Sequence, residues 1–257
     1  MSIWALSDLH LAFGAPEKTM EDFGPAWRNY AERIADHWTA LVSKDDLVLV
    51  PGDISWAKHL DQALIDLKWI DALPGTKVIL RGNHDYWWAS SAKLAKVMPP
   101  SIRFIHNSIF LWKEIAIGGS RLWDTNEYSF ERYIEFQENP RARAKSPEEL
   151  SKEKEEEEKI FARELERLKL SLSQIPKDSK VRIAMTHYPP VGADLAPSRA
   201  SRLLEEFEMQ YCVFGHLHNV RKGALPFGEA RGVKYIFASC DYLDFVPNKV
   251  LETVHRG

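Results

Sequence analysis

Cysteine is nearly absent from this sequence of 257 residues, which contains only Cys212 and Cys240. Two cysteines are too few for a disulfide framework, and they lack the close spacing of a zinc ribbon or of a C-x-x-C redox pair. A reducing compartment is the simplest interpretation, so we expect a cytoplasmic protein.

Long apolar runs and an excess of charge of one sign are also missing. No stretch approaches the roughly 20 apolar residues of a membrane-spanning helix, and the opening MSIWALSDLH reaches Asp8 and His10 too early for a signal peptide. The formal net charge of -3 gives no overall attraction to nucleic acid or to anionic membranes. We therefore expect one soluble domain over residues 1–257, without membrane insertion; the number of subunits stays open.

What the sequence does contain is a series of short apolar runs bounded by turn residues, which predict strands. They are residues 2–6, 46–51, 76–80, 114–119, 181–185, 211–215 and 234–239. The runs are nearly continuous, which is typical of parallel strands buried on both faces. Apolar residues at steps of three and four predict helices over about 25–42 and 58–72. This alternation indicates an α/β layered fold, and the short runs after Lys222 predict antiparallel strands that can form a second sheet.

Residues 139–175 begin as a charge run and become amphipathic, with Phe161 and Leu165 at helical spacing. Ser146 suits the N-cap and Pro147 the first helical position, with acidic residues in the opening turn. We expect a long, partly solvated helical insertion here; the alternative is a mobile cap over a site.

Polar side chains that can bind metals follow several of the predicted strands. In chain order they are Asp8, His10, Asp53, Asn83, His84, His187, His216 and His218. Each fragment alone is weak evidence, since a single histidine at a strand end is more often structural. The ordered set D-x-H, G-D, G-N-H-D, H and G-H-x-H is much stronger. Because ligands of α/β sheets bind beyond the carboxyl ends of the strands, we expect these side chains to converge.

Carboxylate, imidazole and amide groups together suit Mn²⁺, Fe, Zn²⁺ or Co²⁺ better than Ca²⁺. Seven ligands, which these residues supply even without His84, are too many for one ion and suit two, if one carboxylate bridges them. Two ions about 3.5–4 Å apart activate a bridging hydroxide and stabilise the attacking and leaving oxygens of a displacement at phosphorus. We therefore expect two divalent ions, with manganese favoured and their identity open.

The order of these motifs, from Asp8 to His218, resembles that of the calcineurin-like metallophosphoesterases, a superfamily of dinuclear metallophosphatases. The resemblance leaves out residues 120–180 and is loose after residue 220. It implies a single-domain four-layer α/β/β/α sandwich with the metals between the sheets. It also implies the ligands of each ion: Asp8, His10, Asp53 and His218 for the first, and Asn83, His187 and His216, with Asp53 as the bridge, for the second.

The resemblance gives His84 a different role, since the matching histidine contacts a phosphate oxygen and protonates the leaving alkoxide. A general acid of this kind contributes roughly 10²–10⁴-fold in rate. Protein phosphatases of the family carry an Asp that orients this histidine three residues after the bridging one, and here that position holds Trp56. This disfavours the protein phosphatase branch and leaves the partner of His84 open, with Asp85 as one candidate.

The residues next to the motifs indicate a substrate only loosely. Tyr86 and Trp87 follow His84, and their rings could stack on a nucleobase, although packing into the core is an equal alternative. Arg81 and Arg121 can pair with a phosphate bidentately, or can simply be solvated.

We predict a metal-dependent phosphoesterase for a small phosphorylated substrate, a phosphodiester or a phosphomonoester, with the diester favoured and a nucleotide-like compound as one option. An inactive interaction scaffold of the same fold is one alternative, although every expected position is filled. A nuclease is another, which the net charge and the acidic run at 148–158 disfavour.

Overall fold

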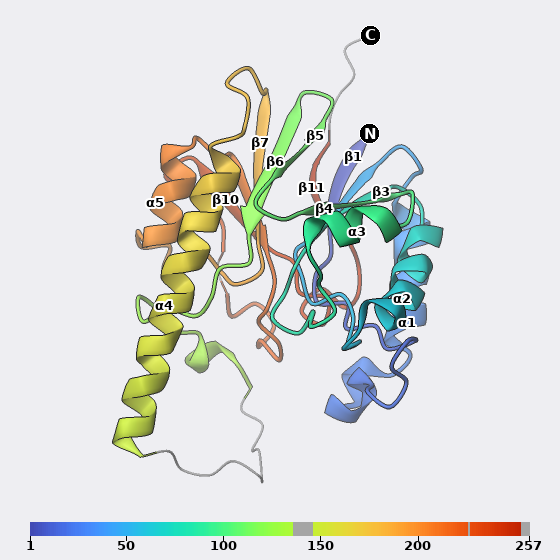
Figure 1. Cartoon of the computed structure of the whole chain (residues 1–257), viewed down its shortest axis with the longest axis horizontal. Coiled ribbons are helices and arrows are strands. Elements are labelled where there is room, and N and C mark those ends of the chain that lie inside the picture. Colours follow the sequence, from blue (N-terminus) through green and yellow to red (C-terminus); the bar gives the residue numbers. More distant parts are fainter. Residues whose placement is uncertain (136–145, 226, 253–257) are drawn as a thin grey trace.

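Two stacked β-sheets with helices on both outer faces make up the computed structural model, which describes residues 1–135, 146–225 and 227–252 (Figure 1). The first sheet has the order β11-β1-β2-β3-β4 and the second the order β5-β6-β7-β8-β10-β9. The strands of the first are β1 (Ser2–Ala5), β2 (Leu47–Val50), β3 (Thr76–Leu80), β4 (Ile102–Ile105) and β11 (Asn248–Glu252). Those of the second are β5 (Ile109–Trp112), β6 (Ile115–Ser120), β7 (Val181–Thr186), β8 (Tyr211–Phe214), β9 (Glu229–Ala230) and β10 (Val233–Phe237).

The helices divide between the two outer faces (Figure 1). On the first sheet lie α1 (Tyr30–Leu41), α2 (Leu60–Ala72) and α3 (Ser91–Val97), and on the second α4 (Pro147–Leu172) and α5 (Arg199–Glu206). Short 3₁₀ turns are η1 (Met20–Phe23), η2 (Pro25–Trp27) and η3 (Glu131–Tyr133). The helix predicted over 25–42 is therefore divided into η2 and α1, because Asn29 between them takes a left-handed conformation with φ of 52°.

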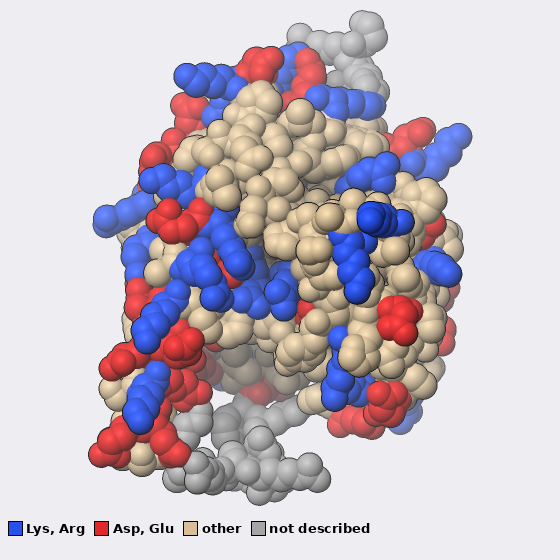
Figure 2. Space-filling view, viewed as in Figure 1, with Lys and Arg blue, Asp and Glu red and all other residues tan. Residues whose placement is uncertain are grey.

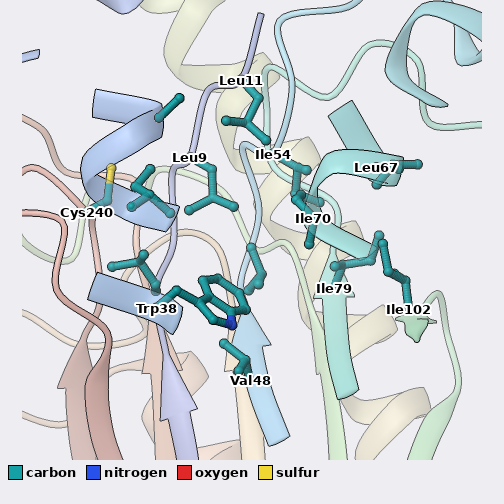
Figure 3. Packing of buried hydrophobic residues seen from close by; sticks show 14 of the residues in the cluster. Leu9, Leu11, Trp38, Val48, Ile54, Leu67, Ile70, Ile79, Ile102 and Cys240 are labelled. Atoms are coloured by element: carbon teal, nitrogen blue, oxygen red, sulfur yellow. The ribbon is translucent and has the colours of Figure 1, made fainter. Parts of the chain in front are cut away.

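Three clusters of buried apolar side chains fill the spaces between these four layers. Trp38, Val48 and Ile70 belong to the cluster between the first sheet and its helices (Figure 3). Leu49, the neighbour of Val48 in β2, belongs to the cluster between the sheets. A third cluster lies under α4 and α5 and includes Phe214. Burial on both faces explains the continuous apolar runs, and the four-layer α/β/β/α sandwich is confirmed.

The parallel strands are shared between the two sheets. Strands β1 to β4 are parallel in the first, and β6, β7, β8 and β10 in the second. The antiparallel prediction for the chain after Lys222 holds for β9 with β10 and for β11 with β1. It was wrong for the pairing of β10 with β8, which is parallel.

Helix α4 begins as the sequence predicts, with Ser146 and Glu149 in a reciprocal capping box and Pro147 in the first turn. Toward its other end the Ser171 hydroxyl accepts the N–H of Gly119 at 2.8 Å and donates to the carbonyl of Ser108 at 2.6 Å. The helix is thus bonded to the second sheet as one of the outer layers. Residues 139–145 of the predicted insertion lie outside the described residues, and a capping role for the segment stays a prediction.

Among the residues described, no helix combines the length and the apolar character that crossing a membrane requires. A cytoplasmic location stays a prediction.

Candidate metal centre

The motif residues meet where the carboxyl ends of the strands of both sheets lie together. Asp8, His10, Asp53 and Asn83 follow strands of the first sheet, and His187, His216 and His218 follow strands of the second. Within the described residues, two groups bring metal-binding atoms within 4.8 Å of one another: Asp8 with His10 and His218, and Asp8 with Asp53 and His187. The two groups are adjacent, because they share Asp8.

One carboxylate oxygen of the second group also lies close to a histidine of the first group. Asp53 Oδ2 lies 3.5 Å from His10 Nε2 and 3.5 Å from His187 Nε2. His10 Nε2 and His218 Nε2 are 3.1 Å apart. On the other side, Asn83 Oδ1 is 2.7 Å from His187 Nε2 and 3.1 Å from His216 Nδ1. Such convergence of imidazole nitrogens with carboxylate and amide oxygens fits divalent transition metals.

Four of these residues take the left-handed backbone conformation. The φ angles are 60° at Asp8, 44° at His10, 51° at Asp53 and 74° at His216. Residues other than glycine pay about 1–3 kcal/mol for such conformations, which persist where the surroundings enforce them and which cluster at functional sites. Here the N–H of His10 donates to the carbonyl of Asp53 at 3.0 Å and holds the two loops together.

The glycines of the motifs allow the backbone to approach the carboxylates closely. A Cβ atom added at Gly82 would overlap the Asp53 carboxylate, and one added at Gly215 would overlap that of Asp8. Residues one or two positions after these glycines donate to the carboxylates. The N–H of His84 donates to Asp53 Oδ1 at 2.8 Å, and the N–H of His216 donates to Asp8 Oδ2 at 3.0 Å. The carboxylates are therefore fixed by the main chain.

Acceptors behind the rings orient two of the histidines. His187 Nδ1 lies 3.0 Å from the carbonyl oxygen of Pro51, and His218 Nδ1 lies 3.1 Å from Asp241 Oδ1. Each contact turns Nε2 toward the site, as is usual for metal-binding histidines. Asp241 was not among the site residues predicted from the sequence. The signal was present, since Asp241 follows the apolar strand β10 just as the other site residues follow theirs.

Burial and the facing charges set the protonation of the site. Burial lowers the pKa of His10 to about 3, so its imidazole is neutral and can bind a metal at neutral pH. For His218, burial is outweighed by Asp241 and Asp8, which raise its pKa to about 9. An ion that binds His218 therefore competes with a proton. Burial would raise the pKa of Asp53, but His187 and His10 hold it well below its ordinary value.

The His84 ring lies at the edge of this centre, and its neighbours are aromatic. Its centroid is 4.8 Å from that of Trp56 and 5.6 Å from that of His10, on which Trp56 is stacked at 4.7 Å. Asp85, the suggested partner of His84, is engaged elsewhere. Its carboxylate accepts the N–H groups of Ile54 and Gly82 and the indole N–H of Trp87. Trp56 thus packs against His84, whereas Asp85 joins the loops after β2 and β3.

The other predicted substrate residues lie in different environments. Tyr86 is 57% exposed, with its ring 6.2 Å from that of His84. Trp87 is buried in the core, which leaves it no free face for a substrate. Arg121 lies on the other side, with its guanidinium over the Trp123 ring and 3.5 Å from Glu164 Oε1.

Comparison with known proteins gives short matches in sequence and longer ones in structure. Two proteins named Gene 66 protein, from Mycobacterium phages L5 and D29, are 36% identical to this chain over 89 and 84 residues, or 32% and 33% of it. The matches span 39% and 40% of the length of these curated relatives. The solved structure of a phosphopantetheinyl hydrolase from Mycobacterium tuberculosis aligns over 100% of this chain and 98% of its own, with TM-score 0.52 and 16% identity. A protein of unknown function from Aquifex aeolicus aligns over 96% and 95%, with TM-score 0.47 and 17% identity.

The match to a family model is the most extensive in sequence. The model of the calcineurin-like phosphoesterases matches residues 1–220, which contain every motif residue from Asp8 to His218. The solved hydrolase supports the same fold. The chain therefore belongs to the calcineurin-like phosphoesterase family.

Proposed function

We propose that this protein is a metal-dependent phosphodiesterase that hydrolyses a small phosphorylated compound at a dinuclear centre. The observation that carries the proposal is the position of Asp53 Oδ2, 3.5 Å from a histidine nitrogen of each ligand group. One carboxylate oxygen between two sets of donors is the arrangement that a bridging ligand needs. Asp8, His10 and His218 would hold one ion, Asn83, His187 and His216 the other, and Asp53 both.

Two divalent ions, for which we favour manganese, would supply a hydroxide nucleophile at neutral pH and would offset charge on the phosphoryl oxygens. The chain itself supplies the proton for the leaving group. His84 is only partly buried, its ring borders the centre, and its main-chain N–H holds the bridging carboxylate at 2.8 Å. Burial lowers the pKa of His84, so its protonated form is the minor species at neutral pH but a stronger acid toward a leaving alkoxide.

Aromatic side chains around His84 support an ester with an organic group on each side of the phosphorus. Phe23 is 52% exposed and lies parallel to Trp56, with ring centroids 6.4 Å apart, and Tyr86 stands on the same rim. These faces offer stacking or apolar contact to a second ester group, which a monoester lacks. One solved protein of similar fold is named a phosphopantetheinyl hydrolase, which agrees with hydrolysis of organic phosphates on this scaffold.

The test is hydrolysis of bis-p-nitrophenyl phosphate against p-nitrophenyl phosphate by chelator-stripped protein with Mn²⁺ restored, and with Asp53→Asn as the matched variant. We expect metal-dependent turnover that favours the diester and that Asp53→Asn abolishes. Preference for the monoester would make the protein a phosphatase. Absence of turnover by protein that binds metal would favour the interaction scaffold.

A further inference from the structure

A cleft lined by arginines opens beside the metal centre, between the outer edges of the two sheets. Its walls come from the ends of β3, β4 and β6 and from α4. The side chains that matter here are Arg81, Arg121, Arg167, Glu164 and His106. Figure 2 shows basic side chains gathered in a hollow in the middle of this face, next to α4. We call it the arginine cleft.

The arginine cleft holds more positive than negative charge. Glu164, whose side chain is 2% exposed, is its acidic residue. The same carboxylate oxygen lies 2.7 Å from Arg167 Nη1 and 3.5 Å from Arg121 Nη2. Arg81 adds a third guanidinium. Burial, together with Arg167 and Arg81, lowers the pKa of His106, which is therefore neutral at pH 7. One carboxylate cannot balance three guanidinium groups.

Two of the arginines carry buried donors without an acceptor. The Nε atoms of Arg81 and Arg121 are both enclosed, and neither has a hydrogen-bond partner among the described residues. Over the same part of the chain, the Arg81 guanidinium forms no ion pair. Buried polar groups are nearly always hydrogen-bonded, so these two donors need an acceptor that the described residues do not supply. The excess positive charge of the cleft favours an anionic acceptor.

The arginine cleft is close enough to the metal centre for one molecule to reach both. Arg81 stands two residues before Asn83, so their Cα atoms are at most about 7 Å apart. The carbonyl of Arg121 accepts the N–H of His187 at 3.1 Å. Arg81 is thus joined to Asn83 by a short stretch of main chain, and Arg121 to His187 by a main-chain hydrogen bond.

We propose that the arginine cleft binds a second phosphoryl group of the substrate, in addition to the one that is hydrolysed. This inference rests on the proposed function of the centre beside it. A phosphoryl group offers several oxygen acceptors, and arginine pairs with it through two parallel N–H donors. This suits Arg81, whose guanidinium forms no ion pair among the described residues, while Arg121 can add its Nε donor. The substrate class is then a compound with two phosphoryl groups, of which one is an ester or diester placed at the metals.

The first experiment compares two chromogenic diesters, thymidine 5′-(p-nitrophenyl phosphate) and the same compound with a 3′-phosphate, on the Mn²⁺-loaded protein. We expect the 3′-phosphate to raise kcat/KM on the order of tenfold or more, as charge-assisted hydrogen bonds do. In Arg81→Gln this advantage should disappear. Arg163→Gln is the control, because Arg163 is 57% exposed and lies 3.9 Å from the same Glu164 without lining the cleft.

The second experiment measures binding of inorganic phosphate to the metal-free protein by ³¹P NMR titration. We expect Arg81→Gln to weaken binding about tenfold and Arg163→Gln to leave it unchanged. Binding that does not depend on Arg81 would overturn the cleft as an anion site. Arg81-dependent binding of phosphate without any preference for the 3′-phosphorylated diester would overturn its assignment to the substrate and make free phosphate the ligand. Arg81-dependent binding without turnover of either diester would refute the proposed function while the cleft stands.

Discussion

Replacing Asp241 by asparagine should weaken the binding of one metal ion although every ligand side chain remains. Asp241 Oδ1 lies 3.1 Å from His218 Nδ1, and Oδ2 accepts the N–H of Asn219 at 3.0 Å. The carboxylate therefore holds the ring with Nε2 toward His10. An asparagine of the same shape can accept only one of these N–H groups, because its other terminal atom is a donor.

The expected magnitude follows from two opposing effects. Loss of the acceptor behind a metal-binding histidine lowers metal affinity about 10- to 100-fold, or about 1.4–2.7 kcal/mol. Burial opposes the proton on His218, but Asp241 and Asp8 raise its pKa to about 9, so at pH 7 the wild-type site must release a proton to bind metal. The variant has a lower pKa and competes less with protons. We therefore expect the loss of affinity to be smaller at pH 7 and to grow as the pH rises toward 9.

The assay is competition for Mn²⁺ between metal-free protein and a chelating dye at both pH values. Asp244→Asn serves as the control, since Asp244 is 71% exposed and pairs with Lys222 at the surface. Equal affinities for wild type and both variants would refute the role given to Asp241. A loss in Asp244→Asn as large as that in Asp241→Asn would refute its specificity.

Further substitutions test the other roles. His84→Ala should retain its metal by elemental analysis while kcat falls about 10²–10⁴-fold; loss of metal would contradict a general acid. Gly215→Ala should lower metal content, because the added Cβ overlaps the Asp8 carboxylate, and full occupancy would show that Asp8 can move away. Asp46→Asn should lower the free energy of unfolding at pH 7 by about 1–3 kcal/mol in urea titrations of metal-free protein. Burial would raise the pKa of Asp46, but hydrogen bonds from Ser2, Ser43 and Trp4 lower it below 3.8. The stabilisation by the Asp46 carboxylate is therefore present above pH 3.8 and is lost as the pH falls through the lowered pKa. The difference between Asp46→Asn and wild type should therefore shrink in acid, and a constant difference would contradict this cause.

Much of the fold could be predicted because the central strands are buried on both faces. In β2, for example, Val48 packs under the helices and Leu49 between the sheets, so the sequence shows an uninterrupted apolar run. Strand β4 was missed because Arg103 and Phe104 are not buried and interrupt its pattern. Strand β5 was missed because it is an edge strand without a buried residue.

The convergence of the candidate ligands follows from a simple rule, since each follows an apolar strand. The same rule applied to β10 would have found Asp241. The division of the ligands between two sheets could not be derived from the pattern, because a parallel strand looks the same in either sheet. The environments of Arg81 and Trp87 could not be predicted from the sequence either. Both lie in the segment around the G-N-H-D motif, yet Arg81 lines an open cleft and Trp87 is buried in the core.

The division of the candidate ligands between the sheets also determines the order in which they are made during synthesis. His218 lies 208 residues after His10, so the first four candidate ligands leave the ribosome long before the last one. At roughly 5–20 residues per second, the stretch from residue 84 to residue 218 alone takes about 7–27 s to make. A nascent chain therefore first displays two carboxylates, an imidazole and an amide, gains His187 and His216 later in that interval, and completes the candidate metal centre only with His218.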